Sequence, residues 1–377
     1  MRILHVVGKL DYGGAETWLV QILRHIDRQK YQMDFLVHTT DPGAYDAEVR
    51  ALGARTIPCL SPSNPLQYAF NFRRLLREHG PYDVVHSHVH HYSGYVLMLA
   101  ATAGVKVRIA HSHSDTRSAE ASKSVERRAY LRAMRTMIRA FATRGLAVSA
   151  EAGCDLFAPQ WRDRTDKWQL QYLGIDLSKF EIEVNAEEVR RSLGIPPDAL
   201  VIGHVGRFCE PKNHAFLVEI AREVVRMEPR SCFLLVGDGP LRAAIEEKVR
   251  NYGLARHFVF AGLRSDVPTL MKGVMDVFLF PSLYEGLPLA VLEAQAAGLT
   301  GVVSDIVPRE SDVIPDLVDR LSLRHSASTW AHALLAQAGH MERPRWCDVM
   351  DRLAGRSIES SVESLTSTYQ HLQAGPV

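Results

Sequence analysis

Cysteine is scarce in this sequence and follows no pattern. The 377 residues include five cysteines, which are scattered along the chain without a C-x-x-C pair. This excludes the cysteine spacing of a disulfide framework and of a zinc knuckle. We therefore expect reduced thiols in a cytoplasmic protein.

Long apolar runs and an excess of one charge are missing as well. No run approaches the ~20 apolar residues of a membrane-spanning helix, and the N-terminal RILHVVG is shorter than a signal-peptide core. With 44 Lys and Arg against 43 Asp and Glu, the net charge is +1. This balance lacks the basic excess of a nucleic-acid-binding protein, so no nucleic-acid partner is expected.

Short apolar runs alternate with helical patterns over most of the chain. They predict five strands in each half, at 2–8, 33–40, 83–88, 107–113 and 145–150, and then at 200–208, 232–239, 258–263, 277–282 and 300–305. Such runs are typical of parallel strands covered on both faces. The alternation predicts an α/β fold of two doubly wound domains.

The domain boundary is expected where polar and charged residues interrupt the strand pattern, near LGIDLSKFEIEVN. We predict a first domain over 1–172, a second over 173–356, and a helix over 357–377 that packs back on the first. Ligands of open parallel sheets bind beyond the carboxyl ends of the strands. A cleft between the two domains is therefore the expected site.

Glycines and histidines follow strands of the first half. Gly13 and Gly14 precede a helix expected near Ala15, where they let the backbone approach an anion; a plain turn is the alternative. HSHVHH over 86–91 and HSHSD over 111–115 end two other strands. Hydrogen bonding to a polyol or general-base work suits these histidines, whereas metal ligation lacks supporting cysteines or dedicated spacing.

Two cations follow the first strand of the second half. Arg207 and Lys212 stand in a loop where they suit a phosphate-bearing ligand, and a solvated loop pair is the alternative. The GDGPLR that follows the next strand lacks the third glycine of a dinucleotide-binding loop. A nicotinamide or flavin site is therefore disfavoured.

Two carboxylates lie in the segment PSLYEGLPLAVLEAQAAG, namely Glu285 and Glu293. Pro288 suits the first position of a helix, which would place the N–H groups of Gly286 and Leu287 at its positive end, ready for a phosphate. Glu293 would lie roughly 7–8 Å along the helix, about the reach from a phosphate to a ribose. These residues predict a nucleotide-sugar site in which Glu285 meets the sugar.

These motifs occur together in the order seen in one family. Glu285-x7-Glu293 with Gly-Leu-Pro, GGAE from Gly13, Arg207 with Lys212, and VGDGP resemble the family 4 glycosyltransferases. The resemblance covers nearly the whole chain. It implies the GT-B fold, in which two Rossmann-like domains face each other across a cleft, a first domain that binds the acceptor and a second that binds the donor.

The resemblance implies a retaining transfer of a hexose from a nucleoside-diphosphate sugar, with UDP the most frequent nucleotide of the family. It gives catalytic roles to Arg207, Lys212, Glu285 and His111, and donor-binding roles to Gly13, Gly14, Gly286, Leu287, Glu293 and His113. The two cations would neutralise the leaving diphosphate, and Glu293 would bind the ribose. One of the two histidines would contact the transferred sugar, and the choice between them stays open.

The segment 304–323 resembles the family members that build bacterial exopolysaccharide and capsule, which implies a lipid-linked or polysaccharide acceptor. One departure is Leu173, where the family usually has Asn. No D-x-D sequence occurs, so we expect the cations and the helix N-terminus, rather than a metal ion or cofactor, to stabilise the diphosphate. The alternatives are a nucleotide-sugar 2-epimerase of the same fold and a non-catalytic nucleotide-sugar-binding protein.

A basic segment runs from Arg117 to Arg144, where eight basic residues and two acidic ones give a local excess of +6. Apolar residues recur in it at helical spacing. A basic amphipathic helix binds anionic membrane surfaces, and the alternative is that its apolar stripe packs on the first domain. We therefore expect a cytoplasmic protein that attaches peripherally to the inner membrane face.

Overall fold

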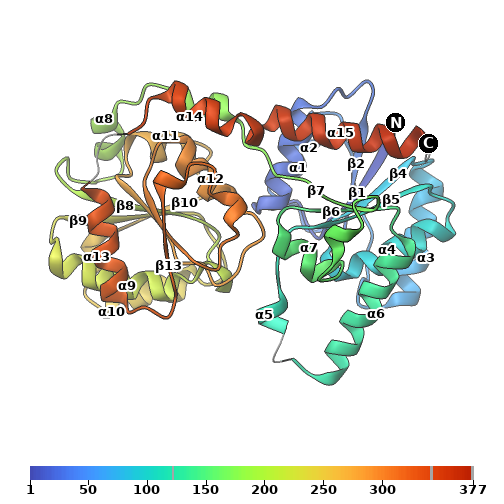
Figure 1. Ribbon diagram of the computed structural model, residues 1–377, viewed down its shortest axis with the longest axis horizontal. Helices are drawn as coiled ribbons and strands as arrows, with labels where there is room; N and C mark the ends of the chain where they lie inside the picture. Colours follow the sequence, from blue (N-terminus) through green and yellow to red (C-terminus); the bar gives the residue numbers. More distant parts are fainter. Residues whose placement is uncertain (121–122, 340–342, 375–377) are drawn as a thin grey trace. The chain divides into compact units, whose positions relative to one another are not determined.

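The computed structural model describes residues 1–120, 123–339 and 343–374. They form two compact units, one comprising Met1–Gly174 with the chain from Ile358 onward, and the other Ile175–Ser357. Each unit contains one parallel β-sheet with helices on both faces (Figure 1). The predicted α/β fold of two parallel-sheet domains is confirmed.

The first unit has a seven-stranded sheet in the order β3-β2-β1-β4-β5-β6-β7. Its strands are β1 Arg2–Val6, β2 Gln32–Val37, β3 Thr56–Pro58, β4 Val84–Ser87, β5 Val107–Ser112, β6 Arg144–Ala147 and β7 Trp168–Leu170. Its helices are α1 Gly14–His25, α2 Asp46–Ala51, α3 Pro65–His79, α4 Ser93–Thr102, α5 Arg117–Glu120, α6 Val125–Phe141, α7 Ala150–Leu156 and α15 Ile358–Ala374. The C-terminal helix α15 packs beside α1 (Figure 1).

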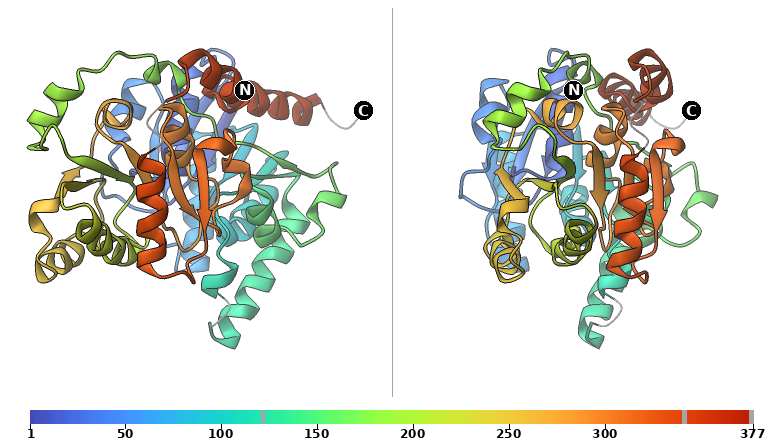
Figure 2. Two further views of the ribbon diagram at one scale, coloured as in Figure 1. Left: turned by 60° about the vertical axis from the view of Figure 1, so that its left-hand side comes forward. Right: turned by 90° about the vertical axis from the view of Figure 1, so that its left-hand side faces the viewer.

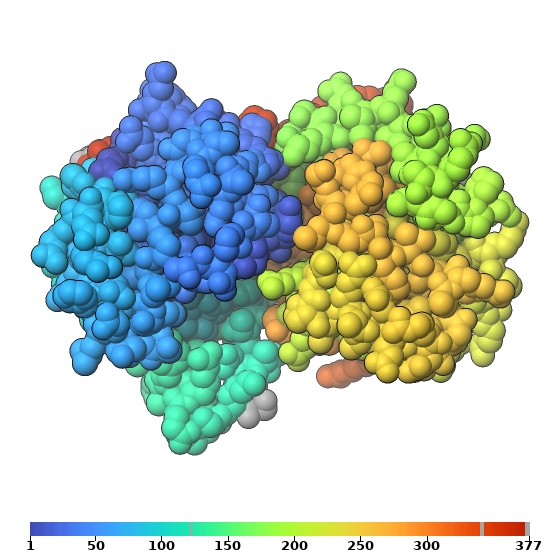
Figure 3. Space-filling model, turned by 180° about the vertical axis from the view of Figure 1, so that it is seen from behind, coloured from blue at the N-terminus to red at the C-terminus, as the bar shows by residue number. Residues whose placement is uncertain are grey.

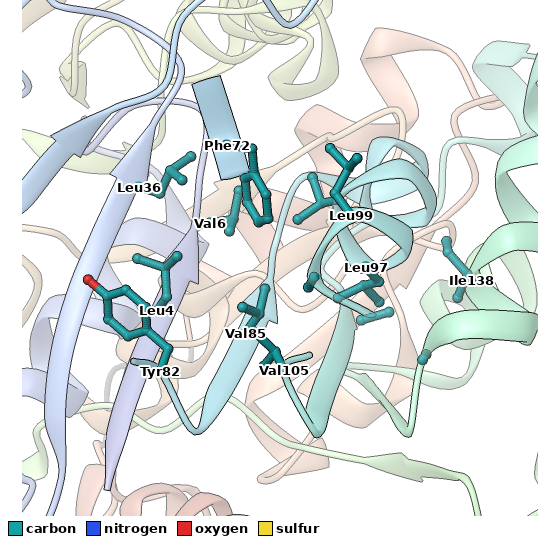
Figure 4. Close-up of a cluster of buried hydrophobic side chains, with 14 of the residues drawn as sticks. Leu4, Val6, Leu36, Phe72, Tyr82, Val85, Leu97, Leu99, Val105 and Ile138 are labelled. Atoms are coloured by element: carbon teal, nitrogen blue, oxygen red, sulfur yellow. The ribbon is translucent and has the colours of Figure 1, made fainter. Parts of the chain in front are cut away.

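The two faces of the first sheet differ in chemistry. Leu4 and Val6 of β1 point into an apolar core with Val85 and with Leu97 of α4 (Figure 4). His5 lies between them in sequence and therefore points to the opposite face. That face is covered by α1 and α15, and it carries polar side chains.

The second unit has a six-stranded sheet in the order β10-β9-β8-β11-β12-β13. Its strands are β8 Leu200–Val205, β9 Ser231–Val236, β10 Phe258–Gly262, β11 Val277–Phe280, β12 Gly301–Ser304 and β13 Val318–Leu321. Its helices are α8 Ala186–Ser192, α9 His214–Met227, α10 Arg242–Asn251, α11 Val267–Gly273, α12 Leu289–Ala296, α13 Ala327–Ala338 and α14 Trp346–Leu353.

All ten predicted strands are present, and the structure adds three that were not predicted. The additional strands β3, β7 and β13 are three or four residues long, and each lies at the edge of its sheet. An edge strand needs fewer apolar residues than a central one, because less of it is enclosed. The hydrophobic pattern of these three segments is correspondingly weak.

Helix α6 projects from the first unit. Its C-terminal half packs on α4, with Gly94 so close to Met134 that an added Cβ would lie 2.4 Å from the Met134 carbonyl oxygen. Residues 125–130, at the N-terminal end of α6, are all exposed. Figure 2 and Figure 3 show this end of the helix projecting from the unit. In the described part of the chain, no helix has both the length and the apolar character to cross a bilayer.

Candidate active site

Lys212 and Glu285 are brought together at the carboxyl ends of two neighbouring strands, β8 and β11. The Lys212 Nζ lies 2.6 Å from the Glu285 Oε1 and 4.7 Å from the centre of the Phe280 ring. Both side chains are largely buried, with 18% and 11% of their surface exposed. Both charges of this ion pair are largely withdrawn from water, which is costly unless they stay paired or meet another charge. The pair is therefore a candidate contact for a charged ligand.

Hydrogen bonds fix the two loops that carry this pair. The Leu283 N–H donates to the Pro211 carbonyl oxygen at 2.8 Å, and the Asn213 side-chain amide donates to the Pro281 carbonyl oxygen at 3.0 Å. Asn213 has a φ of 52°, a left-handed conformation that asparagine tolerates better than most residues. The turn that follows Lys212 is thereby tied to the start of the Glu285 loop.

The glycines of GDGPLR support the loop that carries Arg207. Gly237 has a φ of 135°, and an added Cβ would lie 2.1 Å from the carbonyl oxygen of Gly206. A Cβ on Gly239 would lie 2.6 Å from the carbonyl oxygen of Phe208. These close backbone contacts explain why both positions are glycine without any dinucleotide ligand, because only glycine allows two backbones to approach so closely.

Pro288 is the residue before helix α12, which corrects the prediction that it is the first helical residue. The helix begins at Leu289, and Pro288 has the extended ψ of 109°. Gly286 and Leu287 precede it and are buried. Neither of their N–H groups meets an acceptor within the described residues, so both are available to a ligand oxygen.

Glu293 lies five residues into α12 and is half-buried. Burial raises the pKa of its carboxyl group to about 7, against a weaker opposing effect of Lys179. Its carboxylate makes no hydrogen bond or ion pair with any residue that the structure describes. Arg207, which is predicted to contact the diphosphate together with Lys212, is exposed.

Gly13 and Gly14 form the start of helix α1, one residue earlier than predicted. Gly13 is its N-cap, and the Gly13 carbonyl oxygen accepts a hydrogen bond from the Thr17 N–H at 2.8 Å. A Cβ on Gly13 would lie 2.4 Å from the carboxylate of Glu16. Gly13 therefore leaves room for an acidic side chain at this helix end, whereas a Cβ on Gly14 would meet no atom within 4 Å.

His111 and His113 differ in position although their ring centroids are only 4.1 Å apart. His111 lies inside β5 and is fully buried, with its Nδ1 3.2 Å from the Nε2 of His86. His113 follows the end of the strand and is half-buried, with its Nε2 2.8 Å from the Nδ1 of His88. Burial lowers the pKa of all four imidazoles, to about 3 for His113.

Three members of this face were not predicted from the sequence. His5 lies 3.0 Å from His88, and the hydroxyl of Tyr369 on α15 lies 2.8 Å from the Nδ1 of His86. Trp18 of α1 stacks edge-on against His111. The H-x-H spacing puts His86 with His88 on one face, because alternate residues of a strand share a face, but it does not point to the three added residues.

A separate group holds the loop after β5. Asp155 is fully buried and accepts hydrogen bonds from the Arg135 guanidinium at 2.6 Å and from the Thr116 N–H at 2.7 Å. Burial alone would raise its pKa, but His90 and His91, at 3.4 and 3.5 Å, keep that pKa well below its usual range. This network ties α6 and α7 to the segment after β5.

Two family models match the chain. The Glycosyl transferase 4-like domain matches residues 13–160, and Glycosyl transferases group 1 matches residues 185–338. The putative glycosyltransferase EpsF of Bacillus subtilis is 38% identical over 373 residues, which cover 98% of this chain and 96% of EpsF.

A second relative and a solved structure extend the comparison. The UDP-Gal:alpha-D-GlcNAc-diphosphoundecaprenol alpha-1,3-galactosyltransferase of Escherichia coli is 36% identical over 137 residues, 35% of each chain. Anabaena HepE in complex with UDP-glucose matches with a TM-score of 0.79 at 17% identity, over 98% of this chain and 99% of that one, and so shares the fold. The chain therefore belongs to the group 1 glycosyltransferases of family 4, retaining enzymes with the GT-B fold.

Proposed function

We propose that this glycosyltransferase moves a hexose from a UDP-sugar to a lipid-linked or polysaccharide acceptor in exopolysaccharide or capsule synthesis. The observation that carries the proposal is the buried pair of Lys212 and Glu285 at 2.6 Å, beside the unpaired N–H groups of Gly286 and Leu287. A lysine and backbone donors suit a phosphate, and a carboxylate suits sugar hydroxyls. The E. coli relative is supporting evidence for a UDP donor and a diphosphoundecaprenol-linked acceptor.

In this proposal the ion pair separates when the donor binds. Lys212 and Arg207 contact the diphosphate and stabilise the negative charge that develops on it as the sugar leaves. The Glu285 carboxylate, released from Lys212, accepts hydrogen bonds from the donor sugar, and Glu293 accepts them from the ribose. Gly13 and Gly14 lie near the diphosphate, and His111 or His113 contacts the transferred hexose.

The proposed chemistry uses these groups in place of a metal ion. The first domain binds the acceptor and the second binds the donor. Incubation with a set of UDP-hexoses and a polyprenyl-diphosphate-linked sugar should give UDP and an α-linked product, because retention keeps the donor's configuration. Activity that persists in EDTA supports the metal-independent route, and activity that is lost in EDTA and restored by a divalent ion contradicts it.

The same assay separates the two alternatives. A 2-epimerase converts the donor without any acceptor, and a non-catalytic binding protein shows saturable UDP-sugar binding without even slow donor hydrolysis. Transfer that depends on acceptor excludes both.

The proposal includes attachment to an anionic membrane through α6. Among its cations, Arg127 pairs with Glu120 and Arg135 holds the buried Asp155, so these two are not free for lipid. Arg128 and Arg132 are exposed, and Val125 is 65% exposed at the projecting end. Each free cation near an anionic surface contributes ~1 kcal/mol, which would hold the enzyme where a lipid-linked acceptor is found.

A further inference from the structure

The first unit contains a cavity of about 360 Å³ that the proposed reaction does not use. It lies between the C-terminal end of α6 and the segment that leads from α7 to β7, and its lining includes Arg139, Trp161 and Lys167. Pockets that bind small molecules have volumes of roughly 300–1,000 Å³. The cavity is therefore large enough to hold a ligand.

The cavity lies at the edge of the sheet opposite the candidate active-site residues of this unit. Helix α6 ends at Phe141, shortly before β6 begins at Arg144, and Lys167 directly precedes β7. Strands β5, β6 and β7 are parallel, so their amino ends share one edge, whereas His113 follows the carboxyl end of β5. A ligand in the cavity would therefore be separate from the carboxyl ends of the strands, where the reactants are expected.

Aromatic rings form one wall of the cavity. Trp161 and Trp168 are only 3% and 5% exposed. The Phe157 ring stacks on Trp168 with the centroids 4.5 Å apart and meets Trp161 edge-on at 6.2 Å. A Cβ on Gly145 would lie 2.1 Å from the Trp168 ring, so glycine at this position leaves room for the stack. Rings packed in this way give the cavity a preformed apolar wall.

Three cations line the same cavity, namely Arg139, Arg164 and Lys167. The Lys167 Nζ donates to the Arg139 carbonyl oxygen at 2.6 Å and lies 5.0 Å from the centre of the Trp168 ring. It thereby caps α6 and leaves two N–H groups for another acceptor. The Arg139 side chain is exposed and makes no hydrogen bond or ion pair with any described residue. Arg164 pairs with Asp166 at 3.5 Å on the exposed surface, which contributes little.

The positive charge of the cavity exceeds its negative charge. Among the described residues of the lining, Asp163 is the one carboxylate against three cations. Burial lowers the pKa of Lys167, and the nearby Arg164 and Arg108 lower it further, against an opposing effect of Asp166. An anion in the cavity would relieve this repulsion. Uncompensated cations beside an apolar wall favour a ligand that has both an anionic group and an apolar part.

Helix α6 connects this cavity to the surface that is proposed to meet the membrane. At 3.6 residues per turn, Arg128, Arg132 and Arg139 lie within roughly 40° of one another around the helix, and all three are exposed. This stripe extends from the projecting part of α6 to the cavity, which Arg139 lines. A bilayer surface that lies along the stripe would present lipid headgroups to the cavity.

We propose that the cavity binds the headgroup of one anionic phospholipid. The phosphodiester contacts Arg139, Arg164 and Lys167, and the glyceryl part with the start of the acyl chains packs against Trp161 and Trp168. The stripe on α6 contributes attachment by charge, and the cavity adds a specific contact with a single lipid molecule. The membrane as the source of the lipid rests on the proposed function, whereas binding in the cavity requires neither catalysis nor a bilayer.

The test is calorimetric titration of the full-length protein with dihexanoyl-phosphatidylglycerol, kept below its critical micelle concentration. We expect saturable binding of one lipid molecule per chain. Inorganic phosphate should bind at least about tenfold more weakly, because it has no apolar part to bury. Equal affinity for lipid and phosphate, or titration with the lipid that does not saturate, would overturn the proposal.

Single substitutions locate the binding. Arg139→Gln and Arg164→Gln should each weaken binding of the soluble lipid about fivefold. Arg128→Gln is the matched control, because it removes the same charge from the same stripe of α6 outside the cavity lining, and it should leave the affinity unchanged. Ala158→Leu keeps every charge but narrows the cavity and should also weaken binding. Equal losses in Arg128→Gln and Arg139→Gln, or no loss in Arg164→Gln, would contradict the proposal.

Vesicles distinguish the cavity from the proposed attachment through α6. With phosphatidylglycerol vesicles, wild type should float more strongly than Arg164→Gln, whose substitution lies outside α6. Equal flotation of the two proteins would overturn the role of the cavity and leave attachment through α6 in place. Binding of the soluble lipid without any flotation of wild type would exclude the membrane as the source and overturn the phospholipid assignment.

Discussion

At the scale of the residue, Arg207 and Lys212 have the same proposed role but different surroundings. Arg207 is exposed, and Lys212 is paired with Glu285 in a largely buried position. Replacing either by Ala should lower turnover on the order of 10²–10³-fold. Only Lys212→Ala should also lower the free energy of unfolding, by about 1–3 kcal/mol, because it leaves a buried carboxylate unpaired.

Turnover assays and urea unfolding curves for both variants check this prediction. The double variant Lys212→Ala/Glu285→Ala is the matched control, since it removes both charges and should recover stability without recovering turnover. Less than about a twofold loss of turnover in both single variants would exclude the diphosphate assignment.

The carboxyl group of Glu293 should make the free energy of unfolding depend on pH. Its pKa is raised from 4.5 to about 7, so the folded chain binds more protons than the unfolded chain between these values. The stability that the protonated Glu293 contributes is therefore fully present below about pH 4.5 and is lost as the pH rises through about 7. Glu293→Gln, which mimics the protonated form, should be about 1–3 kcal/mol more stable than wild type at pH 8, and most of this difference should be absent at pH 5.

Denaturant unfolding of the ligand-free protein at the two pH values measures this difference. Glu247→Gln, on the exposed surface of α10, should change stability equally at both. A stabilisation by Glu293→Gln that is the same at pH 5 and pH 8 would show that the carboxyl group does not titrate in this range.

At the scale of the element, α6 is the part of the first unit on which membrane attachment depends. Changing Lys123, Arg128, Arg132 and Arg139 to Gln removes cations without touching the ion pairs of Arg127 and Arg135. Wild type should float with vesicles of anionic lipid at low salt and not with neutral vesicles, and the variant should lose most of this binding.

The control has the same loss of charge at a different place. Changing Arg50, Arg77, Arg226 and Arg250 to Gln removes four cations from four other helices, α2, α3, α9 and α10. If this variant floats as poorly as the first, net charge rather than α6 accounts for binding; if wild type does not float at low salt, the attachment is wrong.

The central elements could be predicted from the sequence, and the edges and contacts could not. Strands such as β1 and β9 are buried over nearly their whole length, so their apolar runs are clear. The edge strand β13 is only half-buried throughout, and its pattern is too weak to recognise. The Lys212–Glu285 pair joins residues 73 positions apart, and the contact of His86 with Tyr369 joins residues 283 apart. Such partners follow from strand order and helix packing, which local patterns do not contain.

At the scale of the whole molecule, histidines that are kept neutral make the first unit sensitive to acid. Their pKa values lie below the usual 6.5 for seven histidines of the first unit, His5, His38, His86, His88, His91, His111 and His113, and for two of the second, His204 and His214. The free energy of unfolding therefore has its full value above pH 6.5 and decreases as the pH falls toward the lowered pKa values of these histidines.

At pH 5.5 a histidine whose pKa lies well below this value costs roughly 1.4 kcal/mol. Six histidines of the first unit, all those named above except His91, together approach the whole stability of a typical domain, so the first unit should unfold between about pH 6 and 5 while the second stays folded. Hydrogen exchange measured by mass spectrometry along a pH series would locate the loss. Simultaneous unfolding of both units, or full protection of the first at pH 5, would contradict the prediction.

The return of α15 to the first unit also decides the order in which a ribosome can complete the two domains. Trp18 donates to Ser361, and His86 contacts Tyr369, so the first sheet lacks one of its covering helices until α15 has been made. At 5–20 residues per second, the nearly 300 residues between β4 and Tyr369 take roughly 15–60 s to synthesise. During that time the second domain, which is continuous in sequence, has everything it needs to fold. The first unit is thus finished after the second.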